Sequence, residues 1–169
     1  MKQNFTIRLL NKSELATAID QFAKHVTYGD RGEAAEHFDE KINGPSDTFF
    51  ASVEGEYAGS LTIRWESHNE QFRQNNIPFI HHLEVQAEFH GQGIANALME
   101  EAEKLIGTRA THAGICVGIF AAYGSAQRLY AKRGYIPDGR GVCQHHRPVE
   151  EGETVTIDHD LMMWLVKAL

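Results

Sequence analysis

The sequence has few of the features that mark secreted or membrane proteins. Its 169 residues include only two cysteines, Cys116 and Cys143, which cannot form a disulfide framework and are typical of a reducing cytoplasm. The longest uninterrupted apolar run covers residues 161–166, far too short to span a membrane. The first residues also lack the apolar segment of a secretory signal. These absences predict a cytoplasmic chain that does not enter a membrane.

Positive charge is scarce as well. The chain carries 16 Lys and Arg against 23 Asp and Glu, a formal net charge of -7. This balance argues against wholesale binding to nucleic acid phosphates, and it suits a cationic substrate only weakly, because many proteins are acidic for solubility alone. A hydrophobic content of 42% is ordinary for a globular protein. The length predicts one domain over residues 1–169, large enough for a proper core.

Ten histidines are present, but no spacing among them is typical of a metal site. The sequence has neither an HExxH motif nor a Cys/His cluster with ligand spacing. Two pairs are adjacent, His81-His82 and His145-His146, and neighbours on a regular strand point to opposite faces. Neither pair is therefore expected to chelate an ion, and we predict no metal. Cys116 is interpreted as a small core residue within a strand.

Hydrophobic periodicity predicts a mixed α/β (α+β) fold, with one central β-sheet flanked by helices on both faces. The arm from Tyr57 to Trp65 alternates as a half-buried strand does. Residues 67–76 are polar and predict a long loop, which either borders a substrate site or is simply exposed. The predicted strands are Phe5–Leu10, a hairpin over Phe49–Glu66 turning near Gly55, Phe79–Val85, Ile115–Phe120 and Val155–Val166. The predicted helices cover Leu15–Val26, Ala34–Ile42, Ile94–Ile106 and Ala126–Lys132.

Two glycines, Gly91 and Gly93, stand where a strand pattern changes into a helix pattern. Glycine there permits positive φ and lets a phosphate approach the free N–H groups at the start of a helix. A tight turn with nothing bound would need the same glycines, so both interpretations remain open at this point. Position 96 is Asn, which excludes the dinucleotide fingerprint, and neither a Walker loop nor the kinase motifs occur.

Two blocks resemble the GNAT superfamily of acyl-CoA-dependent N-acetyltransferases. The first is His90-Gly91-Gln92-Gly93-Ile94-Ala95, similar to the family's Gln/Arg-x-x-Gly-x-Gly/Ala, with Leu83-Glu84-Val85 preceding it at the usual distance. The second, Ala126 to Tyr135, looks like the Ala-x-x-x-Tyr-x-x-x-Gly-Phe/Tyr block. Both lie in the family's order with a predicted strand between them. The resemblance implies a GNAT-like single domain that uses acetyl-CoA as cosubstrate.

The resemblance also implies a cosubstrate site. The turn at residues 90–96 would hold the pyrophosphate, and the strand at residues 83–85 would splay from the next strand, freeing backbone groups for the pantetheine arm. Two positions depart from the family: His90 replaces Gln or Arg, though a neutral imidazole still donates one hydrogen bond, and Tyr123 replaces a frequent Asn, so Tyr123 or Ser125 would take over its contact. The implied cosubstrate-binding residues are Leu83, Glu84, Val85, His90, Gly91, Gln92, Gly93, Ile94, Ala95, Asn96, Tyr123, Ser125, Ala126 and Tyr130.

The implied reaction is direct transfer of an acetyl group to a primary amine. Tyr130 matches the family's general acid, although by spacing alone it would be a packing residue. For the base the residues offer Glu84 or His82, which strand alternation places on one face, and each of them is equally explained as an ordinary strand side chain. The acceptor, a small molecule or a protein amine, cannot be read from the sequence, and homodimers are common in the family. The alternatives are a non-catalytic acyl-CoA-sensing domain and an unrelated nucleotide-binding α/β domain.

Overall fold

The computed structural model describes residues 4–14, 17–18 and 44–169 of the chain. The helices predicted for residues 15–42 lie outside these residues, except for Thr17 and Ala18, which are helical. The described strands are β1 (Phe5–Leu9), β2 (Ser46–Val53), β3 (Glu56–Arg64), β4 (Phe79–Val85), β5 (His112–Gly118), β6 (Ile136–Gln144), β7 (Arg147–Pro148) and β8 (Leu161–Ala168). The described helices are α3 (Glu70–Gln74), α4 (Ile94–Gly107) and α5 (Gly124–Lys132), with short 3-10 turns at Lys12–Glu14, Ala87–Phe89 and Ala121–Tyr123.

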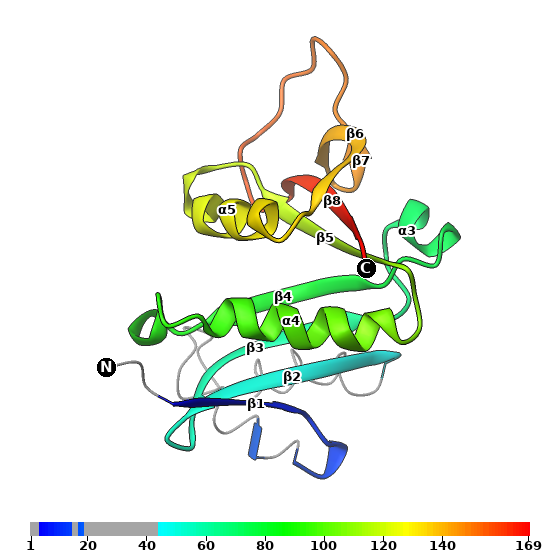
Figure 1. Ribbon diagram of the computed structural model, residues 1–169. Helices are drawn as coiled ribbons and strands as arrows, with labels where there is room; N and C mark the ends of the chain where they lie inside the picture. Colours follow the sequence, from blue (N-terminus) through cyan, green and yellow to red (C-terminus); the bar gives the residue numbers. More distant parts are fainter. Residues whose placement is uncertain (1–3, 15–16, 19–43) are drawn as a thin grey trace.

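All the described strands belong to one mixed sheet, in the order β1-β2-β3-β4-β5-β8-β6-β7. Only β4 and β5 are parallel; the other neighbouring strands are antiparallel. The parallel ladder is short, because only Phe79 and Ile80 pair with β5, opposite Gly114 and Ile115. Beyond these residues the two strands diverge, which separates the half of the sheet carrying α4 from the half carrying α5 (Figure 1). The splay implied by the family resemblance is therefore present.

Helices cover both faces of the sheet. Helix α4 buries Ile94, Leu98, Met99, Ala102 and Ile106 against the main core, which also contains Ile115 of β5. On the opposite face a smaller cluster forms from Phe72, Phe79, Cys143 and Trp164. A Cβ atom at Gly114 would lie 2.2 Å from the Phe72 ring, so this glycine makes room for α3. The predicted α+β architecture with a mixed central sheet is confirmed.

Strand β3 is buried on both faces, so the prediction of a half-buried strand is wrong. The buried polar side chains of its second face, Ser60 and Thr62, have hydrogen-bond partners inside the protein. Thr48 and Thr62 share a hydrogen bond of 2.9 Å, and the Tyr57 hydroxyl donates to Ser60 at 3.0 Å. Alternating polar residues along a strand therefore indicate a solvent-exposed face only when their polar groups have no partners within the fold.

The long loop predicted for residues 67–76 contains the short helix α3. Asn69 caps it, since its Oδ1 accepts hydrogen bonds from the backbone N–H groups of residues 71 and 72, and Phe72 is buried. Strand β5 begins earlier than predicted and ends at Gly118, and β6 was not predicted because its sequence is rich in glycine. These errors share a cause, because short elements held by tertiary packing give weak periodicity.

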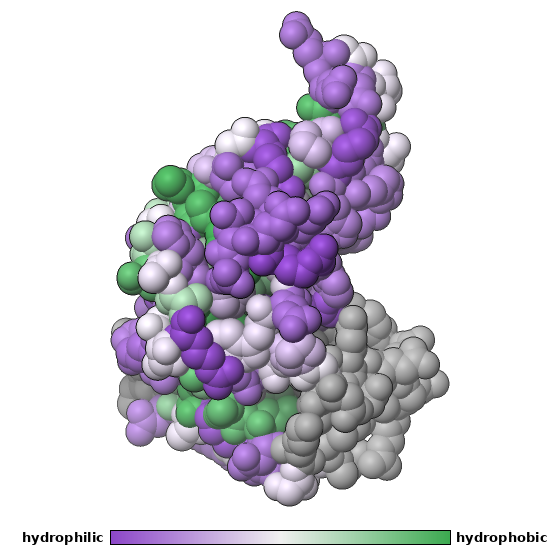
Figure 2. Space-filling model, turned by 90° about the vertical axis from the view of Figure 1, so that its right-hand side faces the viewer, coloured by the Kyte–Doolittle hydropathy of each residue, from purple (hydrophilic) through white to green (hydrophobic). Residues whose placement is uncertain are grey.

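The final strand, β8, begins at Leu161 and not at residue 155. The Asp158 side chain accepts a hydrogen bond from Asp160 N (3.0 Å), which forms a turn directly before the strand. The preceding chain, residues 149–160, projects beyond the sheet in Figure 1, and its tip is hydrophilic in Figure 2. The apolar part of the predicted strand therefore pairs between β5 and β6, while the polar part remains at the surface.

Candidate active site

The turn that begins α4 leaves backbone donors without acceptors. Gly91 and Gly93 have φ angles of +75° and +92°, which other residues rarely adopt. The first helical hydrogen bond runs from Ala97 N to Gly93 O (3.0 Å), and no acceptor within the described chain meets the N–H groups of residues 94–96. These donors lie at the positive end of the helix dipole. The turn therefore has the chemistry of an anion site, as at many phosphate-binding helices.

The space in front of the two glycines is open. A Cβ atom at either position would find no atom within 4 Å apart from those of its chain neighbours, so the described chain leaves this side of the turn accessible. A diphosphate needs that access to reach the backbone. The geometry thus supports the cradle interpretation of the glycines, and the residues present fit the coenzyme that the family resemblance implies.

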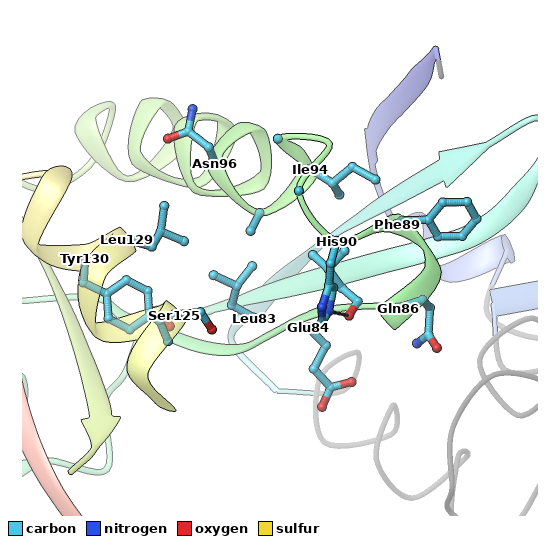
Figure 3. A pocket seen from close by; sticks show the side chains of 15 residues that line it. Leu83, Glu84, Gln86, Phe89, His90, Ile94, Asn96, Ser125, Leu129 and Tyr130 are labelled. Atoms are coloured by element: carbon cyan, nitrogen blue, oxygen red, sulfur yellow. Dashed lines mark hydrogen bonds between the residues drawn. The ribbon is translucent and has the colours of Figure 1, made fainter. Parts of the chain in front are cut away.

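A cavity of about 860 Å³ extends from this turn to α5, through the gap between the diverging strands. Figure 3 shows Tyr130 and Ser125 together at one end, Phe89 at the other, and Leu83 and Glu84 between them. Twelve of the fourteen residues implied by the resemblance line this cavity; the exceptions are Gln92 and Tyr123. Of the candidate bases, Glu84 lines the cavity and His82 does not. The lining residues that sequence reasoning missed are Gln86, Phe89 and Leu129. The first two lie outside the family blocks, and Leu129 occupies an unspecified position of the second block.

Tyr130 is placed on α5 so that its ring enters the cavity while most of its surface is buried. Burial, with smaller contributions from Cys116 and Tyr123, raises the pKa of the Tyr130 phenol above its ordinary value of 10.0. Burial likewise raises the pKa of the neighbouring Cys116 thiol to about 12. The surroundings of Tyr130 therefore disfavour both a phenolate and a thiolate.

His90 does not turn its ring N–H toward the anion site. Its Nε2 lies 2.8 Å from the carbonyl oxygen of Val85, and a carbonyl can only accept, so Nε2 carries the hydrogen. The single N–H of a neutral imidazole is thereby used within the protein. The family block has Gln or Arg at this position. Here His90 instead connects the turn before α4 to the end of β4 through its hydrogen bond to Val85.

Tyr123 lies outside the cavity, in a cluster of its own. Its hydroxyl is 3.0 Å from His159 Nδ1, and its ring packs against Phe120 and fills the space where Gly118 has no side chain. Ser125, at the start of α5, lines the cavity instead. Of the two residues that were expected to replace the family's Asn, the structure places Ser125 where it can reach a ligand.

A β-bulge interrupts β4 beside the cavity, and it overturns the alternation expected for His81 and His82. His81 pairs with Thr62 but Glu84 pairs with Ser60, so β4 has one residue too many between them. His82 takes a φ of +49°, and its ring stacks on the His81 ring with 3.6 Å between centroids. The two imidazoles therefore do not point to opposite faces, because a bulge breaks the period of two.

In the part of the chain that the structure describes, no group of three or more His, Cys, Asp or Glu residues is arranged to hold a metal ion. No described helix is both long and apolar enough to cross a membrane.

The model of the acetyltransferase (GNAT) domain matches residues 14–148, most of the chain. The protein belongs to the GNAT acetyltransferase family. Members of this family are generally acyltransferases that use acetyl-CoA. No curated protein matches the sequence.

Several solved structures share the fold at low sequence identity. An aminoglycoside 6'-acetyltransferase type Ii superposes with a TM-score of 0.69 at 17% identity, covering 96% of both chains. The spermidine/spermine N-acetyltransferase of Vibrio cholerae gives 0.62 at 13% identity, over 98% of this chain and 95% of that one. RimL, a ribosomal-protein acetyltransferase in complex with coenzyme A, gives 0.66 at 12% identity, over 98% and 94%. This GNAT protein thus shares its whole fold with enzymes whose named acceptors differ widely.

Proposed function

We propose that this GNAT protein is an N-acetyltransferase that transfers the acetyl group of acetyl-CoA directly to a primary amine. One observation carries the proposal: the free N–H groups at the α4 turn and the Tyr130 ring belong to a single cavity between splayed strands. The first feature suits a diphosphate, and the second places a proton donor at the far end. The neighbours named above act on aminoglycosides, polyamines and ribosomal protein, so an amine acceptor is the common chemistry.

The α4 turn would hold the diphosphate, and β4 would hold the arm that leads to the thioester. The N–H groups of residues 94–96 supply several donors without any side chain, and desolvation strengthens hydrogen bonds to a charged oxygen. Past Ile80, no described strand pairs with the edge of β4 that faces β5, so an extended ligand could lie along this edge beside Leu83–Val85. Acetyl-CoA supplies the activated acetyl group.

Tyr130 acts as the general acid in this proposal. Its raised pKa keeps the phenol protonated throughout the neutral range, so it can donate a hydrogen bond to the leaving sulfur. A free thiol is ordinarily the stronger acid, which would make proton transfer from a phenol unfavourable. Burial raises the pKa of both groups, as the raised pKa of Tyr130 and the value of about 12 for Cys116 illustrate. A thiolate leaving group in these surroundings is therefore a stronger base than in water, and the phenol would stabilise it first by donating a hydrogen bond to the sulfur.

Glu84 is the base that the geometry favours over His82. It lines the cavity beside Leu83 and Val85, whereas the His82 ring stacks on His81 outside the lining. A carboxylate there can accept a proton from the acceptor ammonium, directly or through a water molecule, before the amine attacks.

The test is release of free coenzyme A thiol from acetyl-CoA with a panel of amines: aminoglycosides, polyamines, amino acids and peptides with a free N-terminus. We expect at least one class to give turnover. Tyr130→Phe should then lower kcat by roughly 10² to 10⁴ with little change in KM for acetyl-CoA, because the phenol acts only on the reacting sulfur. An unchanged kcat would remove Tyr130 from the chemistry.

A chain that binds coenzyme A by calorimetry but transfers to no amine would instead be a non-catalytic acyl-CoA-sensing domain. A chain that binds ATP or NAD and not coenzyme A would contradict both assignments.

A further inference from the structure

Arg133, three residues after Tyr130, joins both helices that border the cavity. Its Nε and Nη2 donate to the two carboxylate oxygens of Glu103 on α4, at 3.0 and 2.7 Å. Its Nη1 donates to both the backbone oxygen and the side-chain Oδ1 of Asn96, at 3.2 and 2.6 Å. Lys167 of β8 completes the group with a bond of 2.6 Å to Glu103. One guanidinium thus spans from α5 to two separate turns of α4.

The anchor of this group is well shielded from water. The side chains of Arg133 and Glu103 are only 13% and 10% exposed. Burial opposes ionisation of Glu103, but the hydrogen bonds from Arg133 and Lys167 outweigh it and lower the pKa of this carboxyl. A two-point bond between planar groups fixes orientation as well as distance, which a single lysine contact does not do.

Asn96 is the exposed member and lies in the third position of α4, where it lines the cavity next to the anion turn. An arginine donates and never accepts, so the amide must turn its oxygen toward Arg133. Figure 3 shows the Asn96 oxygen on the side of α5 and the nitrogen directed away from it. No described residue accepts from the Asn96 Nδ2 group, whose two N–H donors are left for a ligand beside the free backbone N–H groups.

We propose that Arg133 is a positioning residue: it fixes the Asn96 amide so that its N–H donors face the diphosphate of the cosubstrate. The inference rests on the proposed binding of coenzyme A and goes beyond it, since Arg133 itself does not line the cavity. Glu103 holds the guanidinium in place. Lys167 is a second cation that donates to Glu103 and helps to keep its carboxylate ionised. The same bonds hold α5 at a set distance from the α4 turn.

Binding of coenzyme A by calorimetry tests this role without requiring turnover. Arg133→Gln and Asn96→Ala should each weaken binding by roughly tenfold, as expected when a hydrogen bond to a charged group is lost. The double variant should be no more than about twofold weaker than either single variant, because both changes remove the same donor group. Arg133→Lys keeps the charge but cannot bond at two points, and it should bind as weakly as Arg133→Gln.

The matched control is Arg128→Gln, which removes an equal charge at an exposed position within α5, the helix whose C-cap is Arg133. No ion pair of Arg128 occurs in the described part of the chain, and binding should change by less than about twofold. Melting temperatures identify variants that lose stability, and binding is measured well below the lowest of them. Independent effects that multiply in the double variant, or full recovery of affinity in Arg133→Lys, would overturn the positioning role.

The outcome separates this inference from the proposed function. Tight binding by the unaltered protein with the coupling described, but without transfer to any amine, would support Arg133 and contradict the enzyme. Acetyl transfer by the unaltered protein, together with normal coenzyme A affinity in Arg133→Gln, would support the enzyme and contradict the positioning role of Arg133.

Discussion

The two walls of the cavity are built in different ways. The α4 wall consists of one continuous turn, residues 90–96, whose function depends on backbone N–H groups and on two glycines with positive φ. The β4 wall is the part of β4 from residue 81 to residue 85, of which only residues 83–85 line the cavity. It depends on a bulge at which His82 adopts a left-handed conformation and Glu84 remains in the cavity lining. The first wall is local in sequence, whereas the second requires β3 as a partner and β5 to diverge.

This difference between the two walls predicts at which positions the identity of a side chain affects binding or catalysis. On the α4 wall most of the proposed donors belong to the main chain, so apart from the two glycines and Asn96 the identity of a side chain should matter little. On the β4 wall a single side chain, Glu84, is proposed to move a proton, and its neighbours decide where it points. We therefore expect substitutions on the β4 wall to change the rate and substitutions on the α4 wall to change affinity.

The largest expected effect separates the two candidate bases on the β4 wall. Glu84→Gln should lower kcat/KM by roughly 10² or more at neutral pH and remove the acidic limb of its pH profile, because the amide cannot accept the ammonium proton. His82→Asn should stay within about threefold of the unaltered protein, since Asn removes the imidazole but tolerates the positive φ of this position. Initial rates between pH 5.5 and 9.5, at saturating acetyl-CoA and with the amine varied below its KM, measure kcat/KM for the amine in both variants.

The reverse pattern, a large loss in His82→Asn and none in Glu84→Gln, would make the histidine the base. A comparison of His82→Asn with His82→Val adds a check on strain, because valine disfavours positive φ and should lower the melting temperature further.

The next effect concerns affinity on the α4 wall. Gly93→Ala should weaken coenzyme A binding by roughly tenfold or more, because the new Cβ lies on the accessible side of the turn and the φ of +92° strains an alanine. Gly152→Ala is a matched control, with a φ of +90° and nothing within 4 Å, but remote from the cavity lining. Equal affinities for the two variants would show that the turn does not hold the coenzyme.

The smallest expected effect belongs to His90, although it occupies a prominent position of the family block. His90→Ala should change the affinity for coenzyme A by less than about threefold, because its Nε2–H already donates to Val85 within the protein. Calorimetry at pH 7.5, beside Gly93→Ala, gives the comparison. A loss as large as that of the glycine variant would mean that the imidazole leaves Val85 and contacts the anion directly.

Much of this fold and site could be predicted from local patterns. The α4 helix, the glycine turn and Tyr130 followed from residues that lie within one short segment each. Predictions failed where a residue's surroundings come from elsewhere in the chain. Phe72 anchors the otherwise exposed helix α3 by packing on Trp164, and the hydroxyl pair Thr48–Thr62 allows a polar face of β3 to be buried. The role of His90 could not be predicted either. Its partner is the backbone carbonyl of Val85, a group that every residue has, and only the path of the chain brings the two together.

By itself, the sequence determined the family, the order of the main elements and the glycine turn before α4, since these depend on motifs, on periodicity and on where glycine permits positive φ. Only the tertiary structure decided that Glu84 and not His82 lines the cavity, that Tyr123 turns to His159, and that Arg133 bridges α4 and α5. The physical reason is that a register shift of one residue, or a contact between residues 37 apart such as Arg133 and Asn96, leaves no periodic trace in the sequence.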